Sequence, residues 1–99
     1  METAKVIWSD KAISNLRKIH SYISEDSLER ANKVVEKILA KTSQLELFPK
    51  SGRKIPELNE FVRYRELIVK PYRVQYKVEN NVVSILQVIH SKQFFERLF

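Results

Sequence analysis

The chain has 99 residues, of which 43% are hydrophobic and 30% are charged, and it contains no cysteine. This length supports one hydrophobic core, so we expect a single domain over residues 1–99. The composition excludes gross disorder, and the lack of cysteine excludes a disulfide scaffold and a zinc–thiolate site. No apolar run is long enough to cross a membrane or to act as a signal peptide, so we expect a cytoplasmic protein without a membrane partner.

The formal charge of +6 is distributed unevenly along the chain. Residues 1–49 contain eight Lys or Arg and seven Asp or Glu, a net charge of +1, whereas residues 50–99 contain ten and five, a net charge of +5. A basic second half is typical of a protein that binds nucleic acid or an acidic partner, although a basic surface also serves solubility alone.

The first half of the chain predicts one strand and two helices. Ala4–Trp8 is a short run of β-forming residues, and Ser9-Asp10 then offers a helix N-cap. Apolar residues recur at helical spacing in two stripes, the second preceded by a capping-box pattern of Asp26 and Glu29: Ala12, Leu16, Ile19 and Ile23, then Ala31, Val35, Ile38, Thr42 and Leu45. The short break between the stripes favours an antiparallel helix hairpin.

The second half predicts a meander of three antiparallel strands. Val62–Val69, Tyr72–Val78 and Val82–His90 are rich in β-forming residues, and Lys70-Pro71 and Asn80-Asn81 separate them. The loop 50–60 before them holds the only glycine, Gly52, which excludes glycine-rich nucleotide-binding loops. After the meander, the tail 91–99 predicts a short helix or ordered arm whose aromatic residues need burial.

These elements, in the order β-α-α-β-β-β, predict an α+β fold with two layers. We expect the helix hairpin to lie across one face of a mainly antiparallel sheet of four strands, which the first run joins. The pair Arg53 and Lys54 is expected beside this sheet.

Alternation along the strands predicts which side chains face outward. Tyr72, Val74, Tyr76 and Val78 fit the core, with Tyr64 on the same face, whereas Arg73, Gln75 and Lys77 point the other way. We expect Arg65 to lie outward beside Arg73, with His90 at the end of the next strand. Two arginines and a histidine on one face would suit a phosphate group.

Several short patterns occur together along nearly the whole chain, and their order resembles the RelE/ParE superfamily of bacterial toxins. They are Val6-Ile7-Trp8-Ser9, Phe48-Pro49-x-x-Gly52-Arg53, Arg65-Glu66-Leu67, Tyr72-Arg73-Val74-x-Tyr76 and Val88-Ile89-His90. The resemblance implies a type II toxin that forms a hetero-oligomer with a cognate antitoxin, whose extended or helical segment covers the sheet and helices of the toxin.

Two branches of this superfamily differ in their target. RelE-like and YoeB-like toxins cleave messenger RNA in the ribosomal A site, whereas ParE-like toxins poison DNA gyrase. The junction around Pro49 and Gly52 and the Ile89-His90 ending are similar to the ParE-like branch. The chain also departs from the RelE-like pattern, because its tail contains no tyrosine and Lys92-Gln93 follows the last strand. Gyrase is therefore the favoured target, with the ribosome and its messenger RNA as the alternative.

The resemblance assigns catalytic roles only in the RelE-like alternative. Arg73 matches the arginine of the Tyr-Arg-x-x-Tyr motif and would stabilise charge in the transition state, with Arg65 as a further basic group. His90 would be the general acid or base. The structural alternatives are an ion pair of Arg73 with Glu66 and a hydrogen-bonded His90 at a strand end, so enzymatic activity stays open.

Further cations are candidates for contact with phosphate or with the target: Arg53, Lys54, Arg63 and Lys92. With two histidines far apart in sequence and no cysteine, we expect neither a metal nor a cofactor. A third possible function is that of a non-catalytic basic domain that binds nucleic acid.

Overall fold

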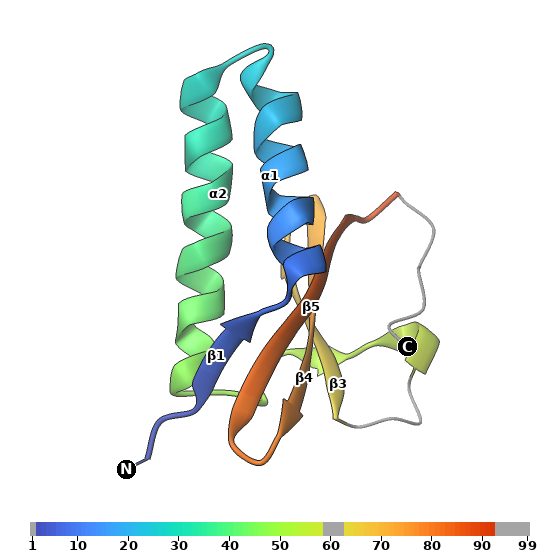
Figure 1. Cartoon of the computed structure of the whole chain (residues 1–99). Coiled ribbons are helices and arrows are strands. Elements are labelled where there is room, and N and C mark those ends of the chain that lie inside the picture. Colours follow the sequence, from blue (N-terminus) through green and yellow to red (C-terminus); the bar gives the residue numbers. More distant parts are fainter. Residues whose placement is uncertain (1, 59–62, 93–99) are drawn as a thin grey trace.

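The computed structural model describes residues 2–58 and 63–92 (Figure 1). The predicted tail 91–99 lies mostly outside this part of the chain. The elements follow in the order β1 (Lys5–Trp8), α1 (Asp10–Ser24), α2 (Leu28–Ser43), η1 (Gln44–Glu46), β2 (Arg53–Lys54), η2 (Pro56–Leu58), β3 (Tyr64–Val69), β4 (Tyr72–Glu79) and β5 (Val82–His90), where η marks a 3-10 helix. No helix in these two segments has the length and apolarity needed to cross a bilayer.

The strands form one sheet in the order β1-β5-β4-β3-β2. β1 runs parallel to β5, and the other neighbours are antiparallel. The predicted α+β class and element order are confirmed, but the sheet has five strands rather than four. The difference comes from Arg53–Lys54, which pairs with β3 at the sheet edge instead of lying beside the sheet.

The helix hairpin covers one face of the sheet (Figure 1). The Ser9 hydroxyl caps α1 by accepting a hydrogen bond from the Ala12 amide at 3.0 Å, and the Ser27 hydroxyl caps α2 by accepting from the Arg30 amide at 3.1 Å. The second cap is therefore Ser27 and not Asp26, one residue earlier. Each cap satisfies an amide that the first helical turn leaves without a partner.

The main core lies between the hairpin and the sheet. The two apolar stripes of the helices point inward as their spacing predicts, and the strands contribute the side chains that alternate toward the helices. Its buried members are Ala4, Ala12, Ile38, Leu45, Val69, Tyr72, Val74, Tyr76, Val83, Ile85 and Val88.

The hairpin of β3 and β4 corrects the predicted position of Arg65. The two-residue turn at Lys70 and Pro71 pairs Val69 with Tyr72, and in this register Arg65 lies opposite Tyr76. Cross-strand partners point to the same face of a sheet. Arg65 therefore shares the helix-facing side with the buried Tyr76, and the prediction that it lies beside Arg73 is wrong.

The same register places Tyr64 on the other side of the sheet, which we call the far face. Tyr64 pairs with Lys77 and is half-buried outside the main core, so its predicted core position is also wrong. Glu66 and Arg73 share the far face.

A β-bulge in β5 changes which of its side chains face the helices and which lie on the far face. Gln75 pairs with Gln87, whereas the next residue, Tyr76, pairs with Ile85, which leaves Leu86 without a cross-strand partner in β4. The extra residue shifts the alternation by one position. As a result, Ile85 faces the helices while Gln87 lies on the far face.

Candidate functional site

Arg73 lies on the far face of β4 and is held between two carboxylates. Its Nε donates to Glu66 Oε1 at 2.8 Å, while Nη1 and Nη2 donate to the two oxygens of Glu57 at 3.0 and 2.6 Å. Only 11% of the Arg73 side chain is exposed. The predicted alternative, a cross-strand ion pair with Glu66, is therefore present, and the bidentate pair with Glu57 in η2 adds to it.

Glu66 is the centre of a polar row that crosses four strands of the far face. Its carboxylate is fully buried and accepts hydrogen bonds from Arg53 Nε at 2.7 Å and Gln75 Nε2 at 2.9 Å. Gln75 Oε1 in turn accepts from Gln87 Nε2 at 2.6 Å. We call Arg53, Glu66, Gln75 and Gln87 the far-face row. Because a buried carboxylate is stable only when it is well paired, these donors make Glu66 a fixed part of the fold.

The charges of this cluster balance. Two arginines, Arg53 and Arg73, face two carboxylates, Glu57 and Glu66. The hydrogen bond from Arg73 lowers the pKa of Glu57 below its usual value, against a smaller opposing effect of desolvation. The bond to Glu57 likewise raises the pKa of Arg73. Both groups are thus charged at neutral pH.

A cavity of about 360 Å³ opens beside Arg73 at the end of the sheet where β3 turns into β4. Three of the described residues that line it are cations and none is a carboxylate. The lining consists of Arg53, Ile68, Lys70, Pro71, Tyr72, Arg73 and Ser91. Such a surface is suited to an anion.

Arg65 occupies a different environment, on the helix-facing side. Its Nη1 donates to the carbonyl oxygen of Gly52 at 2.9 Å, and the amide of Gly52 donates to the hydroxyl of Tyr76 at 2.9 Å. Burial raises the pKa of the Tyr76 phenol, so this hydroxyl is neutral at physiological pH. Arg65 and Tyr76 together hold the loop that precedes β2.

His90 ends β5 on the helix-facing side, opposite Tyr72. The two rings are 5.6 Å apart and nearly perpendicular, with an interplanar angle of 84°. His90 Nδ1 accepts the amide N–H of Lys92 at 3.0 Å, so the neutral ring carries its proton on Nε2. A smaller cavity of about 240 Å³ lies here, lined by Lys18, Ile19, Tyr22, Tyr72 and His90.

The three residues predicted for catalysis are therefore not brought together. Arg73 lies on the far face, whereas Arg65 and His90 lie on the helix-facing side. Their cross-strand partners on β4, Tyr76 and Tyr72, are four residues apart. That spacing corresponds to roughly 13 Å along a strand. One phosphate group cannot contact all three side chains in this arrangement.

The four predicted binding cations are also dispersed. Arg53 joins the far-face row, Lys54 is exposed on the edge strand β2, and Lys92 is exposed after β5. Arg63 forms an exposed ion pair with Glu79 at 3.5 Å and lies 5.8 Å from the centre of the Tyr64 ring. Among the described residues, no group of three His, Asp or Glu side chains is placed to hold a metal ion.

Sequence reasoning missed Glu57, and it missed the burial of Gln75 and Gln87. Glu57 belongs to a stretch predicted as loop, and nothing in its pattern points to Arg73. Gln75 was correctly expected to point away from the helices, but not to be buried. The pairing of Gln75 with Gln87 depends on the bulge at Leu86. No turn-forming residue at that position indicates a bulge.

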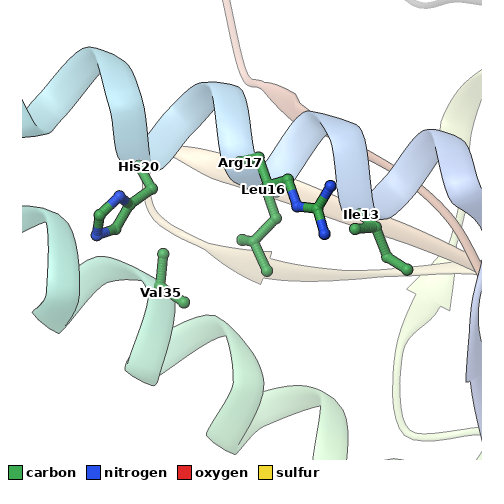
Figure 2. A pocket seen from close by; sticks show the side chains of 5 residues that line it. All are labelled: Ile13, Leu16, Arg17, His20 and Val35. Carbon is green, nitrogen blue, oxygen red and sulfur yellow. The ribbon is translucent and has the colours of Figure 1, made fainter.

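A second surface feature is a groove of about 390 Å³ between the helices, lined by Ile13, Leu16, Arg17, His20 and Val35 (Figure 2). Leu16 from α1 and Val35 from α2 point toward each other across it. His20 Nε2 on α1 lies 2.8 Å from Asn32 Oδ1 on α2, and this contact joins the two helices. An apolar groove with a basic rim fits an amphipathic segment of a partner protein.

The site thus lies on a five-stranded sheet covered on its other face by a helix hairpin (Figure 1). The family model described as ParE toxin of type II toxin-antitoxin system, parDE, matches residues 6–95. The chain therefore belongs to the ParE toxin family and is a toxin of a type II toxin–antitoxin module.

Individual relatives agree with this assignment. The chain is 30% identical to Y4kP of Sinorhizobium fredii over 95 residues, which cover 94% of each protein. It is 28% identical to Toxin RelE2 of Caulobacter vibrioides over 89 residues, which cover 89% of this chain and 96% of the relative.

Solved structures share the fold at lower sequence identity. The chromosomal ParDE system of P. aeruginosa matches with a TM-score of 0.73 and 23% identity, covering 89% of this chain and 96% of that one. A mutant of E. coli toxin RelE in the free state matches with a TM-score of 0.64 and 17% identity, covering 91% and 85%. The RelBE2 toxin-antitoxin complex of Mycobacterium tuberculosis matches with a TM-score of 0.59 and 20% identity, covering 89% and 98%.

Proposed function

We propose that this toxin acts in the cytoplasm by poisoning DNA gyrase, without chemistry of its own, until an antitoxin neutralises it. The observation that carries this proposal is the separation of Arg73, Arg65 and His90. An RNA-cleaving site needs a group that stabilises charge and a group that moves a proton at the same phosphate. Here Arg73 is paired with two carboxylates on the far face, and His90 lies on the other side of the sheet.

The second candidate is ribosome-dependent, metal-independent cleavage of messenger RNA. The 28% identity to Toxin RelE2 supports it, as does the presence of both Arg73 and His90 in this chain. This activity would require Arg73 and His90 to contact the same substrate. Their positions on opposite faces of the sheet oppose that arrangement.

Two assays on purified protein separate these candidates. We expect the toxin to inhibit supercoiling by gyrase and to accumulate cleaved DNA, and to leave messenger RNA intact in a translation reaction. Addition of the antitoxin should reverse the effect on gyrase. Cleavage of messenger RNA in the ribosomal A site, with unaffected gyrase, would overturn the proposal in favour of the second candidate.

The antitoxin is proposed to place an amphipathic segment in the groove between α1 and α2. Structural neighbours of this chain include a ParDE system and a RelBE2 toxin-antitoxin complex, which supports a protein partner of this kind. The groove exposes Ile13 beside the half-buried Leu16 and Val35, and burial of these side chains would favour binding.

A charge placed in the groove tests this assignment. Ile13→Glu should weaken binding of the antitoxin by roughly tenfold or more, because it puts a carboxylate in an apolar contact. Leu28→Glu is the matched control, since Leu28 is exposed at the start of α2 and is not part of the groove lining. Calorimetric titrations that give equal affinities for the two variants would place the antitoxin elsewhere.

A further inference from the structure

We propose that two copies of this chain associate through the open edge of β1, with the two β1 strands antiparallel and related by a two-fold axis at Ile7. The partner is a second copy of the toxin, and the two sheets become one continuous sheet. This inference goes beyond the proposed action on gyrase and does not depend on it, because it concerns contact between toxin molecules.

The open edge of β1 is the first support. β1 is an outer strand of the sheet, and its inner side pairs with β5. The amide of Ser9 donates to the carbonyl oxygen of Ile85 at 2.9 Å, toward β5. Because the backbone groups of successive residues point to opposite sides of a strand, those of Val6 and Trp8 point away from β5. Such an edge is a template for pairing with another strand.

The neighbouring elements limit this open edge to a few residues. At one end, the amide of Ala4 already donates to the carbonyl oxygen of Glu46 in η1 at 2.8 Å. At the other end, Ser9 is still extended, with φ −70° and ψ 159°, and it caps α1. The edge is therefore open over residues 5–9, and a second strand centred on Ile7 fits this length.

Pairing about Ile7 buries an exposed apolar side chain on each copy. Ile7 pairs with Ser84, which also pairs with Lys77, so Ile7 lies on the far face. Its side chain is 45% exposed. In the symmetric register Ile7 lies directly opposite Ile7 of the second copy, where side chains of antiparallel strands approach closely. Both side chains then lose contact with water, which favours association.

The helix-facing side of the edge is also complementary to itself. Val6 of each copy pairs with Trp8 of the other, and each such pair exchanges both backbone hydrogen bonds. A cavity of about 230 Å³ borders the edge here and is lined by Val6, Trp8, Leu39, Thr42, Ser43 and Glu46. Leu39 in this lining is 44% exposed. The Trp8 side chain of the second copy would cover the cavity beside Leu39.

Charges favour the same register. Lys5 and Asp10 are both exposed, and Lys5 lies opposite Ser9 of the second copy, next to Asp10. Each end of the paired strands thus brings a cation near a carboxylate and sets no like charges opposite each other. A shift of two residues would place Lys5 opposite Ile7, or Val6 opposite Asp10, which already lies in α1. The strand therefore matches a second copy of itself in one register.

Sedimentation velocity on the purified toxin tests the dimer. The paired edge is short, so we expect a monomer–dimer equilibrium within roughly 1–300 µM protein. Ile7→Lys should weaken the dimer about tenfold or more, because it sets two cations opposite each other in place of an apolar contact. Ile68→Lys is the matched control and should leave the dimer unchanged. Ile68 is 42% exposed on the same face of β3, and β4 and β5 separate it from β1.

A charge exchange tests the two-fold register itself. Ile7→Lys and Ile7→Glu should each be largely monomeric, whereas an equal mixture should recover the dimer, because the two positions face each other. The chain contains no cysteine, so Ile7→Cys supplies a single thiol. Opposite positions of paired strands lie within the range that a disulfide spans, so this variant should form a covalent dimer about tenfold faster than Ile68→Cys under mild oxidation.

Several outcomes would overturn the proposal. They are a wild-type toxin that stays monomeric over the whole concentration range, equal effects of Ile7→Lys and Ile68→Lys, and a mixture of charge variants that fails to recover the dimer. A monomeric toxin whose affinity for the antitoxin falls in Ile7→Lys would assign the edge to the antitoxin instead. Inhibition of gyrase is measured separately, so none of these results decides the proposed function.

Discussion

At the scale of single residues, Arg73 shows why a motif residue need not be a free functional group. Alternation correctly predicts that it points away from the helices, but the far face carries the buried carboxylate of Glu66. Replacing Arg73 by alanine would remove one donor from this carboxylate, which costs roughly 1.5–3 kcal/mol of folding stability. A loss of toxicity in that variant would therefore have to be compared with its loss of folded protein.

Glu57 should make the stability of the toxin depend on acid pH. Its pKa is lowered in the folded state by Arg73, so ionised Glu57 stabilises the fold above the ordinary glutamate pKa of about 4.3. This contribution is lost as the pH falls through the lowered pKa. We expect Glu57→Gln to be less stable than the wild type at pH 7, and the difference in urea midpoint to shrink toward zero in strong acid. A difference that stays constant from neutral to acid pH would show that ionisation of Glu57 does not matter.

At the scale of elements, the sequence predicts helices better than the faces of strands. Two apolar stripes define α1 and α2 because helical spacing repeats over many residues. Which side chains of β3 face the helices depends on whether the turn between β3 and β4 has an even or an odd number of residues. A strict two-residue loop at Lys70-Pro71 requires Val69 opposite Tyr72, and that rule would have placed Arg65 on the helix-facing side.

Two further features of the sheet depend on contacts that are distant in sequence. The strand β2 has only two residues, Arg53 and Lys54, and forms because Arg53 meets Glu66 across the sheet edge. The bulge at Leu86 brings Gln87 opposite Gln75 and Ile85 opposite Tyr76, so it is defined by pairing with a separate strand. Neither feature leaves a periodic pattern, so the far-face row of Arg53, Glu66, Gln75 and Gln87 could not be predicted from the sequence.

The conformation of the loop that precedes β2 should depend on glycine at position 52. A Cβ atom there would lie 2.5 Å from the Tyr76 hydroxyl and 2.7 Å from the carbonyl oxygen of Glu66. Because the carbonyl belongs to the sheet backbone, Gly52→Ala should displace the loop and cost roughly 1–3 kcal/mol. Urea unfolding measures this cost, with the exposed Ser51→Ala as control. Equal midpoints for the two variants would contradict the close approach.

The hairpin of β4 and β5 should depend on the residue at position 80. Asn80 and Asn81 have φ angles of 52° and 61°, and two left-handed residues form the turn that suits a twisted hairpin. Alanine tolerates this backbone poorly, so Asn80→Ala should lower stability by about 1 kcal/mol. Asn80→Gly keeps the left-handed conformation accessible and should stay near the wild type. Thermal unfolding of the pair tests this, and equal losses would indicate a role of the Asn80 side chain instead.

At the scale of the whole molecule, the net charge of +5 in the second half of the chain resides mainly on cations other than Arg53, Arg63 and Arg73, which are held in ion pairs. Arg53 and Arg73 are neutralised by Glu57 and Glu66, and Arg63 pairs with Glu79. Among the residues that the structure describes, exposed lysines of this half lie on different elements: Lys54 on β2, Lys70 in the turn before β4 and Lys92 after β5. Such a distribution supports attraction to a large acidic partner more than the concentrated charge of a catalytic centre.

The whole-molecule consequence is that toxicity should survive the loss of His90. Gln at this position can still accept the Lys92 amide, but it loses the edge contact with Tyr72, a change of about 0.5–1.5 kcal/mol. A gyrase poison acts by binding, so His90→Gln should still arrest growth when expressed, and should still bind the antitoxin. A nuclease that uses His90 to move protons would instead lose roughly 10²–10⁴-fold in rate. Induced expression, with the amount of folded toxin measured alongside, decides between them. A folded, antitoxin-binding His90→Gln toxin that no longer arrests growth, together with A-site cleavage by the wild type, would establish the enzyme.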